Sequence, residues 1–339
     1  LMLVGTLVVF LSTRQSAWIY DRLVFWCMGL VLVILTAVIP AEISRDGLGY
    51  VRDIVPNACG FRSCDPADSP LRDSFWYGSI TFLRGIVGNE RAAFYLAALG
   101  LLIKLWVIDR LCRNRVLALV LLIPLVYVQY DFTQFRAGFA ISWYFLGIYL
   151  LVQRHVIASV PIVGSCFLWH MQALPSISLY PVYWLNRSKL FVPLAIGGFL
   201  LLLTFGFYPK AQFLASAYTP GIGAERYIAG SLAGEFADAK ALPLGYWPIL
   251  FCAIYVLFER AQPIGLFRAV GASIVVGASL AWFFASNPAL QGRIFEFYMA
   301  PLVLVAGNIG NKSYKMGAVL VLSWILYLRL ELFHDWILG

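Results

Sequence analysis

Long runs of apolar residues without charge are the feature that most limits what this chain can fold into. No charged residue occurs between Leu23 and Ala41, and none occurs between Ala269 and Gln291. A bilayer core is about 30 Å thick, and a helix needs roughly 20 apolar residues to cross it. Charged residues make up 12% of the chain, about half of their share in an ordinary soluble domain. The sequence therefore predicts an all-α polytopic integral membrane protein, with residues 1–339 forming a single transmembrane domain.

The apolar runs predict about twelve transmembrane helices, some of them short or re-entrant. Their approximate ranges are 1–12, 23–40, 92–109, 116–130, 137–153, 156–171, 173–185, 190–207, 245–258, 268–286, 294–308 and 314–332. Cytoplasmic loops of membrane proteins are rich in lysine and arginine, and the basic residues here fall in alternate short loops. This register places both termini and two long loops, 42–91 and 208–244, outside the cytoplasm.

Most single charges near the ends of these segments need no special role. Lys104, Arg154 and Arg329 lie close to predicted segment ends, so we expect their side chains to reach the membrane surface. Asp109, next to Arg110, is expected to be an interfacial charge. The net charge of +8 comes largely from short basic loops and does not indicate a nucleic-acid partner.

The stretch from Gln129 to Ser142, QYDFTQFRAGFAIS, is polar for its place between two apolar segments. It contains Asp131 and Arg136, and Arg136 lies at the outer start of a predicted helix. Ionisable groups at membrane depth are costly, and they are functional candidates for that reason. Arg136 is therefore the first candidate site residue.

Three further ionisable residues lie at the same predicted outer level on two other segments. His170 ends one segment, in CFLWHMQALP, and Arg293 and Glu296 begin another, in NPALQGRIFEFY. Each alone is more often a packing or interfacial residue, but four candidates from three helices at one depth indicate a site. A guanidinium binds phosphate through two parallel hydrogen bonds. A histidine accepts protons near neutral pH. We therefore expect Arg136 and Arg293 to bind a diphosphate and His170 to be the catalytic base, with Glu296 as the alternative base.

Two of the six cysteines, Cys59 and Cys64, lie in the polar stretch NACGFRSCDPADSP of the first predicted outer loop. An oxidising compartment permits disulfides, so we expect these two residues to form one, with two free thiols as the alternative. Neither a CxxC pair nor a histidine cluster indicates a zinc site. We expect no metal and no cofactor.

Several stretches, taken in order, resemble the EpsG family, a branch of the Wzy-type polymerases of bacterial surface polysaccharide. ISRDGLGYVRDIV is similar to the family's Asp-x-x-x-Tyr stretch, and DSFWYGSITFLRGIVGNERAAFYLAAL is similar to its amphipathic stretch and following helix. TQFRAGFAISWYFLGIYLL resembles a Gln-x-Arg-x-Gly-hydrophobic pattern, and CFLWHMQAL and GRIFEFYMAPLVLV resemble later motifs. The resemblance covers about residues 42–308, although the family often has Arg-Gln-Gly where this chain has Arg136, Ala137 and Gly138.

The resemblance implies a glycosyltransferase on the periplasmic face of the bacterial inner membrane. Such polymerases transfer a growing glycan from undecaprenyl diphosphate to the non-reducing end of a fresh lipid-linked repeat unit. The expected partners are therefore the lipid-linked donor and acceptor and membrane lipids, with a chain-length regulator protein as a further one. Asp46, in the first of the similar stretches, is a third candidate base. We expect Gln134, Tyr50, Arg226 and Tyr227 to bind sugar.

Two other functions remain open from the residues alone. An O-antigen ligase-like transferase shares this chemistry and differs in its acceptor. A flippase or transporter of lipid-linked oligosaccharide needs polar residues at mid-depth on several helices, whereas the candidate charges here gather near one face. The sugars, the linkage and the retaining or inverting outcome have no recognisable signature in the chain.

Overall fold

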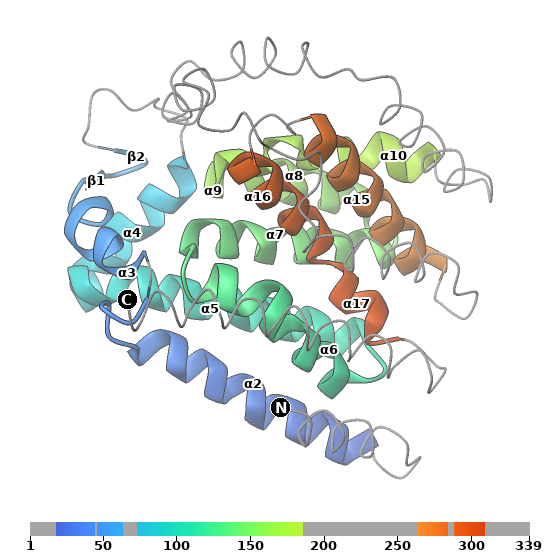
Figure 1. Ribbon diagram of the computed structural model, residues 1–339, viewed down its shortest axis with the longest axis horizontal. Helices are drawn as coiled ribbons and strands as arrows, with labels where there is room; N and C mark the ends of the chain where they lie inside the picture. The colour runs from blue at the N-terminus through green and yellow to red at the C-terminus, as the bar shows by residue number, and fades with distance from the viewer. Residues whose placement is uncertain (1–17, 45, 64–72, 186–263, 284–287, 309–339) are drawn as a thin grey trace.

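The fold is mostly helical in the residues that the computed structural model describes, namely 18–44, 46–63, 73–185, 264–283 and 288–308 (Figure 1). The elements in chain order are α2 (Trp18–Val38), α3 (Gly47–Gly49), the π-helical turn η2 (Tyr50–Ile54), β1 (Ala58–Cys59), β2 (Arg62–Ser63), α4 (Ser74–Val87), α5 (Asn89–Leu111), α6 (Arg115–Leu122), the π-helical segment η3 (Ile123–Asp131), α7 (Phe135–Val152), α8 (Val156–Gly164), α9 (Cys166–Trp169), the 3-10 segment η4 (Met171–Ser178), α10 (Leu179–Leu185), α15 (Ile264–Phe283), α16 (Pro288–Met299) and α17 (Leu302–Ala306).

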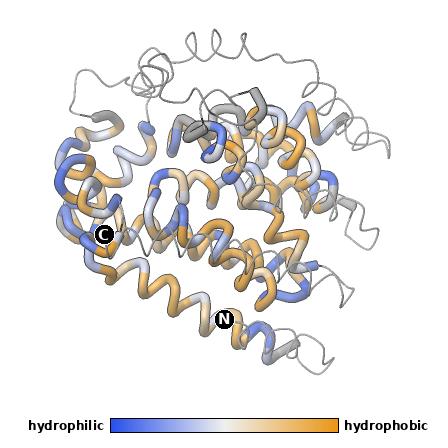
Figure 2. Tube along the Cα trace, viewed as in Figure 1, coloured by the Kyte–Doolittle hydropathy of each residue, from blue (hydrophilic) through white to orange (hydrophobic). Residues whose placement is uncertain are grey.

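Three of the described helices are long and apolar enough to cross a membrane: Tyr20–Val38, Asn89–Leu111 and Phe135–Val152. Hydrophobic residues occupy the middle of α2, α5 and α7, and hydrophilic residues gather toward their ends (Figure 2). Helix α2 lies along one edge of the molecule (Figure 1) and exposes a row of large apolar side chains, which include Leu23, Val31, Ile34 and Val38. Such a surface suits lipid rather than water. The chain is thus a helical membrane protein, and the predicted total of about twelve segments stays a prediction.

Small residues let the central helices approach closely. A Cβ atom placed on Gly100 of α5 would lie 2.9 Å from both Phe139 Cδ2 and Ser142 Oγ of α7. On the other side of α5, a Cβ on Gly29 of α2 would lie 2.9 Å from Leu105. Helices in membranes pack by such close contacts because lipid gives no hydrophobic driving force between them. Helix α5 is therefore the element on which α2 and α7 are both assembled.

Several segments predicted as single helices are broken. The predicted segment 116–130 changes from α6 into the π-helical η3, and 294–308 is interrupted between α16 and α17. The second break falls at Pro301, which has no N–H for a helical hydrogen bond. The pair predicted over 156–185, already expected to be a weak or broken element, consists of the short pieces α8, α9, η4 and α10. Irregular backbone at membrane depth is tolerated where protein buries it.

Lys104 does not reach the membrane surface as the sequence predicted. Its side chain is fully buried, and Nζ lies 2.5 Å from Oδ1 of Asp131, which is also fully buried. The pair joins the C-terminal half of α5 to the end of η3. An isolated buried charge would be very costly, so each of these groups requires the other. The snorkelling prediction was wrong because a partner 27 residues away in the sequence supplies the compensating charge.

A second charged cluster joins the C-terminal end of α5 to the first turns of α2 and α6. Asp109 is buried within the protein, and its Oδ2 accepts a 2.8 Å hydrogen bond from Arg22 of α2; its position at the membrane interface stays a prediction. Its Oδ1 accepts a 2.6 Å hydrogen bond from Nε of Arg115, and Asp21 lies 3.6 Å from the same guanidinium. The cluster fixes the turn between α5 and α6.

The first predicted outer loop contains folded structure. Strands β1 and β2 form a short antiparallel hairpin in which Cys59 is paired with Arg62. Helix α4 follows and buries Trp76, Tyr77 and Ile80 against the rest of the chain. Cys59 is disulfide-bonded. Its predicted partner, Cys64, lies outside the described residues, as does the second predicted loop, 208–244.

Breaking the buried pair of α5 and η3 should destabilise the protein strongly. Lys104→Met or Asp131→Leu alone should cost about 3–5 kcal/mol, because each leaves one buried charge uncompensated, whereas the double variant should recover most of this loss. Unfolding of the detergent-purified protein, followed by tryptophan fluorescence, measures it. Arg110→Met removes an exposed cation from the same helix and serves as the control. Single variants as stable as this control would contradict the interpretation.

We expect Cys59 and Cys64 to be joined to each other. Proteolysis of unreduced, alkylated protein should release one cross-linked peptide pair that contains both residues, and reductant should separate it. The exposed Cys27 should be alkylated in either condition and reports on reagent access. Recovery of alkylated Cys64 without reductant would exclude the pairing.

Candidate active site

Arg136 lies at the first turn of α7, held there by aromatic packing. The ring of Phe135 lies 4.9 Å from Phe94 of α5 and 4.7 Å from Tyr50, measured between centroids. Since α5 begins at Asn89, the start of α7 lies roughly 7 Å along α5 from the beginning of that helix. Arg136 therefore lies close to the N-terminal end of α5, and its side chain is 19% exposed.

A single carboxylate joins Arg136 to His170. Oδ2 of Asp73 accepts a 2.5 Å hydrogen bond from Nη1 of Arg136, and Oδ1 lies 3.8 Å from Nδ1 of His170. Asp73 precedes α4, Arg136 opens α7, and His170 follows α9. Two of the four sequence candidates are thus brought together, by a third residue that the sequence did not indicate.

Tyr50, predicted to bind sugar, is packed against this cluster. Its hydroxyl oxygen accepts a 3.3 Å hydrogen bond from the backbone N–H of Arg136, and its ring lies between Trp76 and Phe135. Burial raises the pKa of the Tyr50 phenol, the positive charge of Arg136 lowers it, and Asp46 raises it further. The hydroxyl therefore stays protonated at neutral pH. With 4% of its surface exposed, Tyr50 orients the start of α7.

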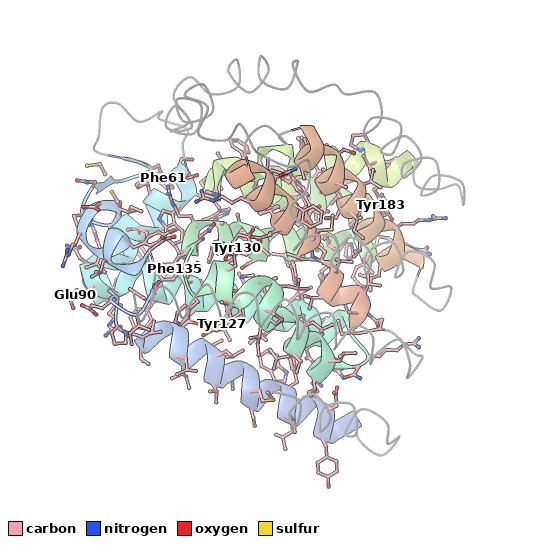
Figure 3. The ribbon with its side chains drawn as sticks, in the orientation of Figure 1. Phe61, Glu90, Tyr127, Tyr130, Phe135 and Tyr183 are labelled. Carbon is pink, nitrogen blue, oxygen red and sulfur yellow. The ribbon has the colours of Figure 1, made fainter. Side chains whose placement is uncertain are left out.

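Arg293 and Glu296 belong to a neighbouring cluster on α16. The hydroxyl of Tyr130 lies 3.2 Å from the backbone oxygen of Arg293 and 3.2 Å from Oε2 of Glu296. Tyr130 lies near the centre of the molecule, on the segment that precedes α7, with Phe135 close by (Figure 3). Both side chains of α16 are half-buried, and they lie within the helix rather than at its predicted start.

The stretch 130–136 connects the two clusters. Tyr130 contacts α16 at one end of it, and Arg136 contacts Asp73 at the other. Asp131, between them, is fixed by Lys104, and a Cβ atom on Gly138 would lie 2.9 Å from its Oδ1. The segments on either side of His170 add a second connection, because α9 contacts α4 and α7 while η4 contacts α16. A common cavity for Arg136 and Arg293 stays a prediction.

Four further residues were predicted to be part of the site: Asp46, Gln134, Arg226 and Tyr227. Asp46 precedes α3, where its backbone oxygen accepts a 3.1 Å hydrogen bond from the N–H of Tyr50. Gln134 directly precedes α7 and is half-buried. Arg226 and Tyr227 lie outside the described residues.

Asp73 carries no signal that separates it in the sequence from its neighbours. It is one of seven acidic residues between positions 42 and 91, and its partners lie 63 and 97 residues further along the chain. The one available clue is its place just before the apolar stretch SFWYGSI, which would indicate a helix cap. The structure gives it a different role.

Loss of the Arg136 guanidinium should destabilise the fold, because the buried carboxylate of Asp73 would lose the positive charge that lies 2.5 Å from its Oδ2. We expect Arg136→Ala to cost about 3 kcal/mol and Arg136→Lys to cost clearly less. Denaturant unfolding in detergent gives both values. Arg52→Ala, at an exposed arginine of η2, is the matched control and should change the stability by less than about 0.5 kcal/mol. Equal stability of the Arg136→Ala and Arg52→Ala proteins would refute a stabilising pair.

Comparison with known proteins gives one match. A family model described as the EpsG family matches residues 77–338, a range that includes α4 beyond its first turn, all later described helices, and the segments that carry Arg136, His170, Arg293 and Glu296. Asp46, Tyr50 and Asp73 lie before it. No curated protein matches, and no solved structure matches.

Proposed function

The chain belongs to the EpsG family of polysaccharide polymerase-like membrane proteins, and on that premise we propose that it joins lipid-linked oligosaccharide repeat units into O-antigen or exopolysaccharide. The donor and the acceptor are glycans on undecaprenyl diphosphate, and the reaction takes place on the periplasmic face of the inner membrane. The observation that carries this proposal is the carboxylate of Asp73, which lies against both a guanidinium and an imidazole. These two groups supply what such a transfer needs: fixed positive charge and a proton acceptor.

The reaction is a glycosyl transfer in which one bond replaces another. A hydroxyl of the acceptor sugar loses its proton to His170, and its oxygen forms a bond to the anomeric carbon of the donor. The bond between that carbon and the diphosphate oxygen breaks, and its electron pair leaves with the lipid diphosphate. Positive charge at the departing diphosphate stabilises the transition state more than the ground state.

Arg136 keeps binding capacity beside its contact with Asp73. A guanidinium has five N–H donors, and the contact with Asp73 uses Nη1. Nε of Arg136 is buried without a hydrogen bond to any described residue. We assign the remaining donors of Arg136, together with Arg293, to the diphosphate. Glu296 is the alternative base, held toward this region by Tyr130, and Asp46 is the third.

The ligase-like alternative differs only in the acceptor and stays open. For the flippase alternative, the buried pair of Lys104 and Asp131 is the relevant observation, since it places two charges in the protein interior, one on α5 and one at the end of η3. Both side chains are fully buried and neutralise each other, so neither is available to a passing head group. The pair therefore supports an enzyme built on a fixed scaffold rather than a charged transport path.

Purified protein in detergent, given two synthetic lipid-linked repeat units and neither ATP nor nucleotide sugar, should lengthen the glycan. We expect His170→Ala to stop growth and Arg136→Lys to slow it by about 100- to 1,000-fold, since a point charge cannot grip phosphate in a bidentate manner. Gel or mass analysis of the glycan measures both effects.

The matched control is His155→Ala, because His155 is an exposed histidine that precedes α8; this variant should elongate normally. Wild-type growth by His170→Ala would remove His170 as the base and direct the next test to Glu296. Absence of growth by the wild-type protein, with transfer of the glycan to a different acceptor, would favour the ligase-like function.

A further inference from the structure

Asp73 combines a left-handed backbone conformation with a buried side chain. Its backbone has φ 48° and ψ 35°, in the left-handed region, which is uncommon outside glycine, although aspartate and asparagine adopt it more readily than other residues. Its side chain is 2% exposed, although a buried carboxylate is costly unless it is compensated. Unfavourable backbone and burial at one residue persist when the surrounding structure holds them for another purpose.

Helix capping is the simplest alternative for an aspartate at this position. A capping aspartate accepts a hydrogen bond from a backbone N–H in the first turn of its helix. Asp73 directly precedes α4, but its side chain makes no such bond. Its carboxylate is instead directed across the fold to α7 and to the residue that follows α9. The carboxylate therefore makes long-range contacts in place of a helix cap.

The two oxygens of this carboxylate face different partners. Oδ2 is 2.5 Å from Nη1 of Arg136, and Oδ1 is 3.8 Å from Nδ1 of His170. His170 has an extended backbone, φ −158°, between α9 and η4, so this residue is not part of either helical segment. The charge of Arg136 compensates the buried carboxylate, which can then act on the imidazole without leaving its place.

We infer that Asp73 is a positioning residue for His170: Oδ1 accepts the proton on Nδ1 and thereby makes Nε2 the proton acceptor for the sugar hydroxyl. Which nitrogen of a histidine carries the proton is set by the hydrogen bond that the other one makes. The negative carboxylate, 3.8 Å away, already favours a proton on Nδ1, and the contact shortens to hydrogen-bond length when substrate fills the site, as catalytic contacts commonly do. The catalytic part of this inference rests on the proposed glycosyl transfer, while the effect on the tautomer does not.

The tautomer is measured by ¹⁵N NMR of protein labelled at histidine, reconstituted in nanodiscs, at a pH where the imidazole is neutral. The chain has three histidines, and the His170 signals are those that disappear in His170→Gln. We expect the pattern of an Nδ1–H imidazole in the wild-type protein and in Asp73→Glu. Asp73→Asn should lose this preference. The control is Asp53→Asn, at an exposed acid of η2, which should leave the spectrum unchanged.

The kinetic arm uses the same variants with the two lipid-linked repeat units. Asp73→Asn should lower kcat by about 100- to 10,000-fold, the usual worth of positioned proton transfer, and change KM by less than about threefold. Asp73→Glu should recover part of kcat, and its activity keeps the test valid if Asp73→Asn folds poorly.

A His170 tautomer that is the same in wild type and in Asp73→Asn would overturn the inference, as would a changed tautomer with an unchanged kcat. If the tautomer changes as expected but the wild-type protein transfers no glycan, the proposed reaction fails and the pairing of Asp73 with His170 stands.

Discussion

The buried ion pair of Lys104 and Asp131 is the contact around which the rest of the site is arranged. It explains why a polar stretch, 129–142, interrupts an apolar part of the chain, because Asp131 must meet a lysine that α5 carries into the protein interior. Once Asp131 is fixed, Tyr130 is directed to α16 and Arg136 to Asp73. The close approach of Gly138 to Asp131 Oδ1 leaves no room for a larger residue there. A buried pair of this kind is weak support for stability but can specify a single arrangement of the chain, and here we assign it that role.

Breaks in the helices occur beside two of the charged contacts of the candidate site. Segment η3 is π-helical and ends at Asp131, and α9 ends at Trp169 before the extended His170. Irregular helical turns of this type are frequent at functional sites. Each break places a polar residue where neighbouring protein, rather than lipid, surrounds it. The regular helices thus carry Arg136, Arg293 and Glu296, and the interruptions position Asp131 and His170.

Much of the fold could be predicted from the sequence, because long uncharged runs have few alternatives to membrane helices. Helices α2, α5, α7 and α15 coincide well with predicted segments, and the family resemblance was confirmed. The side-chain partners could not be predicted. Lys104 and Asp131 are 27 residues apart, and Asp73 and Arg136 are 63 apart, so no local pattern marks either pair. Lys104 lies near a predicted segment end and Asp73 is one of seven acidic residues between positions 42 and 91, so neither position stands out in the sequence.

The central claim is that one outward-facing site holds the diphosphate with Arg136 and Arg293 while His170, held by Asp73, faces the acceptor hydroxyl. A cryo-EM structure of the nanodisc-embedded protein with a non-hydrolysable, phosphonate-linked analogue of the donor lipid tests this most directly. We predict phosphonate oxygens within hydrogen-bond distance of both guanidinium groups, with Nε2 of His170 facing the anomeric carbon across the space for an acceptor. An analogue bound elsewhere, or Arg136 and Arg293 opening into separate cavities, would contradict the account.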